Sequence, residues 1–144
     1  SAGGTPFTLL GDTNDIHYFG HREKFKKLDF DLATLGSYGA RTWEYSKGLG
    51  AWATLTVTDG TSGFTQDGVV SFTPPSDWKQ STVNGVTKFW VRVSVASVTT
   101  AATVNQIKTA LVYLAILLNP VFRRQVENYK TVAYTCEVIQ QENP

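Results

Sequence analysis

The segment from Val86 to Val95 constrains the fold most strongly, because apolar and polar side chains alternate along most of it. One face is expected to hold Phe89, Val91, Val93 and Val95, and the other Lys88, Trp90, Arg92 and Ser94. A period of two is the period of a β-strand with one buried face. The chain must therefore supply a second layer that covers the apolar face of this strand.

Other segments predict the same architecture. Phe25 to Leu32 places Leu28, Phe30 and Leu32 on one face and charged residues on the other. Glycine-rich or proline-rich turns separate the strand-like runs, and no alternation of strands with helices is visible. We therefore expect an all-β fold, an antiparallel jelly roll or β-sandwich. The run 106–118 is left open, because it suits either a short helix or a long strand.

Length and composition predict a single domain over residues 1–144. The net charge of +1 gives no general attraction to nucleic acid or to an anionic membrane surface, so neither is an expected partner. Cys136 is the only cysteine, which excludes an internal disulfide and a zinc cluster of cysteines. The apolar run 110–118 is too short for a membrane-spanning helix, which needs about 20 residues.

A search for catalytic chemistry gives no defensible constellation, and we expect no enzyme, cofactor or catalytic metal. His17 and His21 are four residues apart but flank Gly20 in a strand-and-turn context, which predicts a solvated pair in a turn. Asp29 and Asp31 share the polar face of one expected strand, where a charge-balanced surface is the simpler interpretation.

Acidic turns leave one metal question open. Asp12, Asp59 and Asp67 lie in short polar or glycine-containing turns, as calcium ligands often do. None of these turns has the full spacing of a calcium-binding loop. A structural calcium ion is therefore a minor alternative to an empty turn.

The central part of the chain carries a recognisable set of motifs. These are Trp43-Glu44-Tyr45, Trp52, Leu55-Thr56-Val57-Thr58-Asp59-Gly60-Thr61, Phe64-Thr65, Gly68-Val69-Val70-Ser71-Phe72, Pro74-Pro75-Ser76-Asp77-Trp78, Val83-Asn84-Gly85-Val86, Phe89-Trp90-Val91-Arg92-Val93 and Ala102-Thr103-Val104-Asn105-Gln106-Ile107. Together they resemble a jelly-roll module of structural proteins in tailed bacteriophages and archaeal viruses. The core module would span about 24–107, with additions at 1–20 and 108–144 that serve assembly.

The resemblance implies a virion structural protein, assembled in the host cytoplasm. The small size favours a subunit that decorates or cements a capsid, and a tail or baseplate component is the alternative. Expected partners are further copies of the chain, as a homotrimer or another symmetric oligomer, and major capsid or tail proteins.

The apolar run 110–118 is expected to lie either in the core or against a neighbouring subunit. The arginine pair that follows it suits charged contacts that fix the register of an interface. The candidate interface residues are Leu111, Tyr113, Leu117, Phe122, Arg123 and Arg124.

Carbohydrate binding is the alternative function from a different class, and its partner would be a glycan. Trp43 and Tyr45 share one face of an expected strand, and Tyr38 lies in the adjacent loop. Such rings can stack on sugars, whereas in a thin β core they can equally serve as packing anchors.

Overall fold

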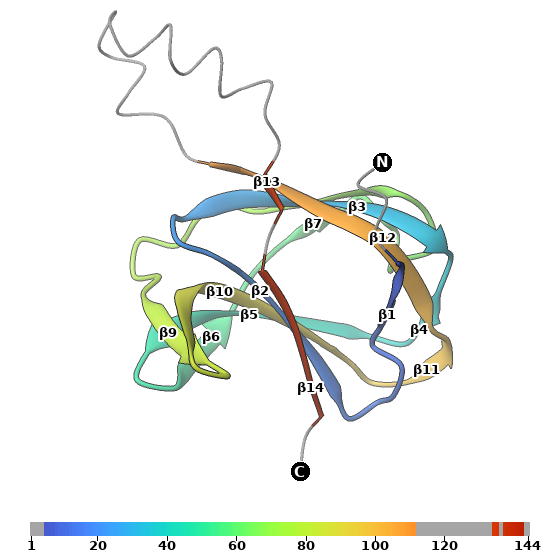
Figure 1. Ribbon diagram of the computed structural model, residues 1–144, viewed down its shortest axis with the longest axis horizontal. Coiled ribbons are helices and arrows are strands. Elements are labelled where there is room, and N and C mark those ends of the chain that lie inside the picture. Colours follow the sequence, from blue (N-terminus) through green and yellow to red (C-terminus); the bar gives the residue numbers. More distant parts are fainter. Residues whose placement is uncertain (1–4, 112–133, 136, 143–144) are drawn as a thin grey trace, which may run out of the picture.

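The computed structural model describes residues 5–111, 134–135 and 137–142, and its regular elements are all β-strands (Figure 1). The described residues contain no helix. The prediction of an all-β antiparallel sandwich is confirmed. The alternating segment Val86–Val95 forms a single strand, as its pattern required.

Two antiparallel sheets face each other across the core (Figure 1). Sheet A has the order β1 (Phe7–Leu9), β12 (Ala102–Leu111), β3 (Phe25–Thr34), β8 (Gly68–Ser71) and β7 (Thr58–Asp59), and β13 (Tyr134–Thr135) also pairs with β12. Sheet B has the order β14 (Glu137–Glu142), β2 (Asp15–His21), β10 (Val86–Val95), β5 (Arg41–Gly48) and β6 (Ala51–Thr54), and β9 (Gln80–Val83) also pairs with β10. A small third sheet joins β4 (Ser37–Tyr38) to β11 (Val98–Thr100).

The strand pairs are nested along the chain. Strand β1 pairs with β12, β2 with β10, β3 with β8, and β5 with β6. The chain is thus a long hairpin that is rolled up so that its successive pairs fall in alternate sheets. This is the topology of a jelly roll.

The two ends of the chain contribute to the sandwich itself. Strand β2, from the expected N-terminal addition 1–20, lies between β14 and β10 inside sheet B. Strand β12 continues the predicted module from Ile107 to Leu111, so the first part of the ambiguous run 106–118 is strand. Residues 112–118 lie outside the described residues.

The core between the sheets combines aromatic rings with aliphatic side chains. Leu28 and Phe30 are fully buried on the predicted inner face of β3, and Leu32 is 8% exposed. Phe30 makes edge-on contacts with Phe19 of the opposite sheet and with Phe64. Such edge-to-face pairs stabilise a core beyond the area that they bury.

Candidate functional site

The predicted sugar-stacking rings are used inside the sandwich. Trp43 on β5 is 5% exposed and packs against Phe19 and Phe64. Tyr45, on the same face, is 9% exposed. Because stacking on a sugar needs an accessible ring face, Trp43 offers no platform in this structure.

Tyr38 has a structural role in the small third sheet. Its hydroxyl donates a hydrogen bond to the carbonyl of Leu9 and accepts one from the amide of Ala102 at 2.6 Å. It therefore ties β1 to β12. Burial is the main cause that raises the pKa of Tyr38 above its ordinary value.

A polar cluster surrounds the hydroxyl group of Tyr45. The Tyr45 hydroxyl donates to Oδ1 of Asp77 at 2.9 Å, and Nζ of Lys47 donates to Oδ2 at 2.5 Å. The hydrogen bonds from Lys47 and then from Tyr45 lower the pKa of Asp77. The same carboxylate raises the pKa of Tyr45 and of Lys47. These groups hold the turn before Trp78 against β5.

The outer face of sheet B carries the most unusual surface in the described part of the chain. Apolar side chains gather there on the side that faces away from the core. We call this group the outer aromatic cluster. Tyr18, Val83 and Trp90 are its buried members, and Ile16, Trp52, Val86 and Ile139 are its partly buried members.

Trp90 is the centre of the outer aromatic cluster and is fully buried. It lies opposite Gly20 on β2, and a Cβ atom at Gly20 would lie 2.4 Å from ring carbons of Trp90. The ring therefore covers the glycine backbone. Its Nε1 donates to the carbonyl of Ser81 on β9 at 2.8 Å, which satisfies the buried indole N–H.

A charged pair is packed into the same cluster. Nε of Arg92 donates to Oε1 of Glu44 at 2.9 Å, across the β10–β5 pairing. The Arg92 guanidinium also lies over the ring of Trp52, 4.1 Å from its centroid. Tyr18 contacts Trp52 edge-on, with centroids 5.6 Å apart. The result is a surface that offers aromatic area together with one positive and one negative group.

The sequence held a signal for this surface that the prediction left unused. The alternation along Val86–Val95 assigns Trp90 and Arg92 to the polar side of their strand. A tryptophan on the solvent side of a two-layer sandwich is unexpected unless another element or molecule covers it. Trp52 and Tyr18, which complete the surface, come from strands far away in the sequence.

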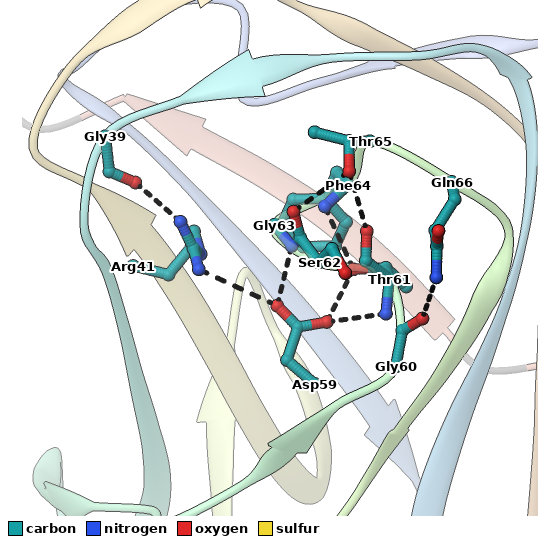
Figure 2. A network of polar contacts seen from close by, with 10 residues as sticks. All are labelled: Gly39, Arg41, Asp59, Gly60, Thr61, Ser62, Gly63, Phe64, Thr65 and Gln66. Carbon is teal, nitrogen blue, oxygen red and sulfur yellow. Dashed lines mark hydrogen bonds and ion pairs between the residues drawn. The ribbon is translucent and has the colours of Figure 1, made fainter.

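In the acidic turn after β7, backbone amides of the turn itself bind the carboxylate of Asp59 (Figure 2). Oδ1 of Asp59 accepts hydrogen bonds from the amide and the hydroxyl of Thr61, and Oδ2 accepts one from the amide of Gly63 at 2.9 Å. Arg41 lies 3.9 Å from the same carboxylate. Asp59 thus stabilises the loop directly, and this loop gives no support to a calcium site.

The other acidic turns are used in the same way. Oδ1 of Asp67 accepts from the amide of Leu32 at 2.8 Å, and Oδ1 of Asp12 accepts from the amide of Asn14 at 3.1 Å. Among the described residues, no three His, Cys, Asp or Glu side chains gather in a way that would hold a metal ion.

The prediction of a solvated histidine pair is wrong for His17. His17 is fully buried on β2, where its Nδ1 accepts the amide of Leu10 at 3.1 Å and its ring packs near Phe7 and Phe19. Strand β2 continues through Gly20 to His21, so no turn separates the two histidines. Burial is the main cause that lowers the pKa of His21, which is only half-buried.

Of the candidate interface residues, Leu111 lies within the described residues. Leu111 ends β12, where its backbone is paired with Phe25. The remaining candidates lie outside the described residues: Tyr113, Leu117, Phe122, Arg123 and Arg124. Cys136 also lies outside them.

Comparison with protein-family models, with curated proteins and with solved structures found no match to this chain. Within the described ranges, no helix is long and apolar enough to cross a membrane.

Proposed function

We propose that this protein is a structural subunit of a virus particle, and that it binds a neighbouring copy of itself through the outer face of sheet B. The observation that carries the self-association is the outer aromatic cluster. Both faces of sheet B are apolar at their centre, whereas an antiparallel sheet with one solvated face alternates apolar and polar side chains. Trp90 is covered within the cluster, and the partly buried members Ile16, Trp52, Val86 and Ile139 are the ones that keep accessible apolar surface. Accessible apolar surface that is gathered on one face marks protein contacts.

The charged pair at the cluster fits a symmetric contact. In a two-fold or other closed interface between identical chains, one patch meets the same or a neighbouring patch of its partner. Arg92 and Glu44 lie side by side within the cluster, so each can also face the opposite charge of a second copy. Such pairs fix register, while the aromatic area supplies most of the free energy of binding.

The virion setting is supported by the resemblance of residues 43–107 to jelly-roll modules of viral structural proteins. Within that setting, we favour a subunit that decorates or cements the capsid over a tail or baseplate component. The partners would be further copies of this chain, in a trimer or another symmetric oligomer, and major capsid or tail proteins. Each copy would stabilise the particle by burying surface at the joints between subunits.

A matched pair of valines tests the self-association. Val86 is partly buried in the outer aromatic cluster, and Val69 is partly buried on β8 in sheet A, paired with Asp29. We expect wild-type protein at micromolar concentration to sediment as an oligomer in analytical ultracentrifugation. Val86→Lys should convert it to monomer, and Val69→Lys should leave the oligomer intact.

Thermal unfolding of both valine variants controls for misfolding. A wild-type chain that sediments as a monomer over the whole micromolar range would refute self-association. An oligomer that Val86→Lys leaves intact would exclude the sheet B face as the contact. Mass spectrometry of purified particles tests the virion setting separately, since a subunit of the particle must be present there at stoichiometric amounts.

A further inference from the structure

A second surface lies on the side of the sandwich where the chain passes from sheet B to sheet A. The segment from Thr54 to Thr58 links edge strand β6 to edge strand β7. Together with Lys26, Lys27 and the residues that follow β8, it borders an open groove with a volume of about 670 Å³. We call this the edge groove. Its size is that of an ordinary ligand site.

The charged side chains that line the edge groove are all positive. Two lysines, Lys26 and Lys27, line it, and no Asp or Glu is among its lining residues. Lys24 adds a third ammonium group nearby, where it donates to the carbonyl of Pro75 at 3.2 Å. Because the whole chain carries a net charge of only +1, this positive character is local to the groove.

Two carboxylates close to the groove in the sequence are already used within the protein. Asp77 is bound by Lys47 and Tyr45, and the Asp59 carboxylate is closed within its own loop. Neither Lys26 nor Lys27 forms an ion pair within the described part of the chain. The two ammonium groups are therefore available to an external anionic group.

The wall of the groove also offers backbone groups. Thr56 and Val57 exchange no backbone hydrogen bond with another described residue outside the strand ladders, and neither belongs to a strand. Unpaired N–H and C=O groups along an extended edge are a template for a further strand. The aromatic residues of the groove, Tyr45 and Phe72, are each 9% exposed, so they give a sugar ring little to stack on.

We infer that the edge groove binds an extended acidic peptide segment of a partner protein, which pairs with the backbone at Thr56 and Val57 and places carboxylates against Lys26 and Lys27. Backbone pairing supplies affinity in this mode of recognition, and the side-chain contacts supply selectivity. The site is separate from the outer aromatic cluster. Peptide binding in the edge groove can therefore be tested independently of self-association.

The probe is a fluorescein-labelled peptide of about eight alternating residues, in which the β-branched Thr favours an extended chain and Glu supplies the negative charge. We expect saturable binding by fluorescence anisotropy that weakens as salt is added. In ¹⁵N-edited NMR spectra, the amides of Thr56 and Val57 should shift. The double variant Lys26→Gln/Lys27→Gln should bind the peptide roughly 3- to 10-fold more weakly.

Two controls separate the elements of this inference. Lys88→Gln, in the β9–β10 hairpin and away from the groove lining, should bind the peptide like wild type. A peptide N-methylated at alternate residues keeps its charge but loses its pairing N–H groups, so its binding should be lost. Because Lys26 and Lys27 bond to neighbours through their carbonyls, the glutamine variants should keep the wild-type thermal unfolding.

Three outcomes would overturn the inference. The first is no binding of the Thr–Glu peptide at millimolar concentration. The second is equal binding of the N-methylated peptide, which would reduce the interaction to charge attraction alone. The third is binding of oligogalacturonic acid at the same amides with no binding of the peptide, which would assign the groove to acidic saccharides.

Discussion

The outer faces of the two sheets differ although both belong to one sandwich. On sheet A, the outer face of β3 and β12 is polar: Asn105 donates to Asp31 at 3.2 Å, and Lys108 lies opposite Asp29. On sheet B, the corresponding face holds the outer aromatic cluster, with Trp90 fully buried at its centre. The outer face of sheet A is thus polar, whereas sheet B carries a second apolar layer on its outer face.

This difference shows which of the two outer faces contributes more to the free energy of unfolding. A polar strand face contributes little beyond its backbone pairing, because its side chains exchange water for weak surface pairs. A buried tryptophan contributes several kcal/mol through the area and the contacts that it brings. Substitutions on the two outer faces should therefore have very unequal effects.

Trp90→Ala should give the largest effect. It removes the centre of the outer aromatic cluster and leaves a cavity under Tyr18, so the free energy of unfolding should fall by about 3–5 kcal/mol. Urea unfolding followed by circular dichroism measures the loss. Lys27→Ala on the polar face of sheet A is the control and should change stability by no more than about 0.5 kcal/mol. A similar fall in the free energy of unfolding in both variants would show that the two outer faces contribute equally to stability.

Gly20→Ala should give the next largest effect. The added Cβ would lie 2.4 Å from the ring of Trp90, so either the ring or strand β2 must shift, at a cost of about 1–3 kcal/mol. Gly11→Ala is a matched control, since the atom nearest to the added Cβ, Cγ2 of Thr8, would be 3.3 Å away.

A double-mutant cycle sharpens the glycine prediction. In the Trp90→Ala background the ring is absent, so Gly20→Ala should cost close to nothing, and the coupling between the two sites should approach the full cost of the clash. If Gly20→Ala were equally destabilising with and without the ring, the cost would come from the backbone of β2 and not from Trp90.

The fold was predictable from the sequence wherever local pattern determines it. The alternation in Val86–Val95 and in the run that starts at Phe25 correctly gave strands and their inner faces, because a period of two forces side chains to opposite sides. The histidine prediction failed for the opposite reason. The His17 ring faces the core beside Phe7 and Phe19, because β2 runs inside sheet B between β14 and β10, which are distant in sequence.

The candidate site was harder to predict for the same reason. The outer aromatic cluster joins Tyr18, Trp52 and Trp90, which meet only after β2, β6 and β10 are brought into one sheet. The edge groove likewise needs the ends of both sheets to be in place. Trp43 and Tyr45 were correctly assigned to one strand face, but only the packing against the opposite sheet shows that this face is the inner one.

The two ion pairs also differ in how far solvent reaches them. Substitutions at the more exposed pair should have the smallest effect on stability. The side chains of Arg92 and Glu44 are 21% and 26% exposed, whereas those of Lys47 and Asp77 are 38% and 48% exposed. An exposed pair is screened by water and salt. The contribution of Asp77 to stability should therefore be small, but its dependence on pH has a definite sign.

The pKa of Asp77 in the folded protein is below its ordinary value of 3.8, first because of the hydrogen bond from Lys47 and second because of the one from Tyr45. A carboxyl group with a lowered pKa stabilises the fold above its unfolded pKa, and that contribution disappears as the pH falls through the folded value. Wild type should therefore melt at a higher temperature than Asp77→Asn at pH 6, and the two melting curves should converge below pH 3.8. A gap that stays constant down to the most acidic pH would show that the carboxylate charge has no part in holding this turn, and that the hydrogen bond from Tyr45 suffices.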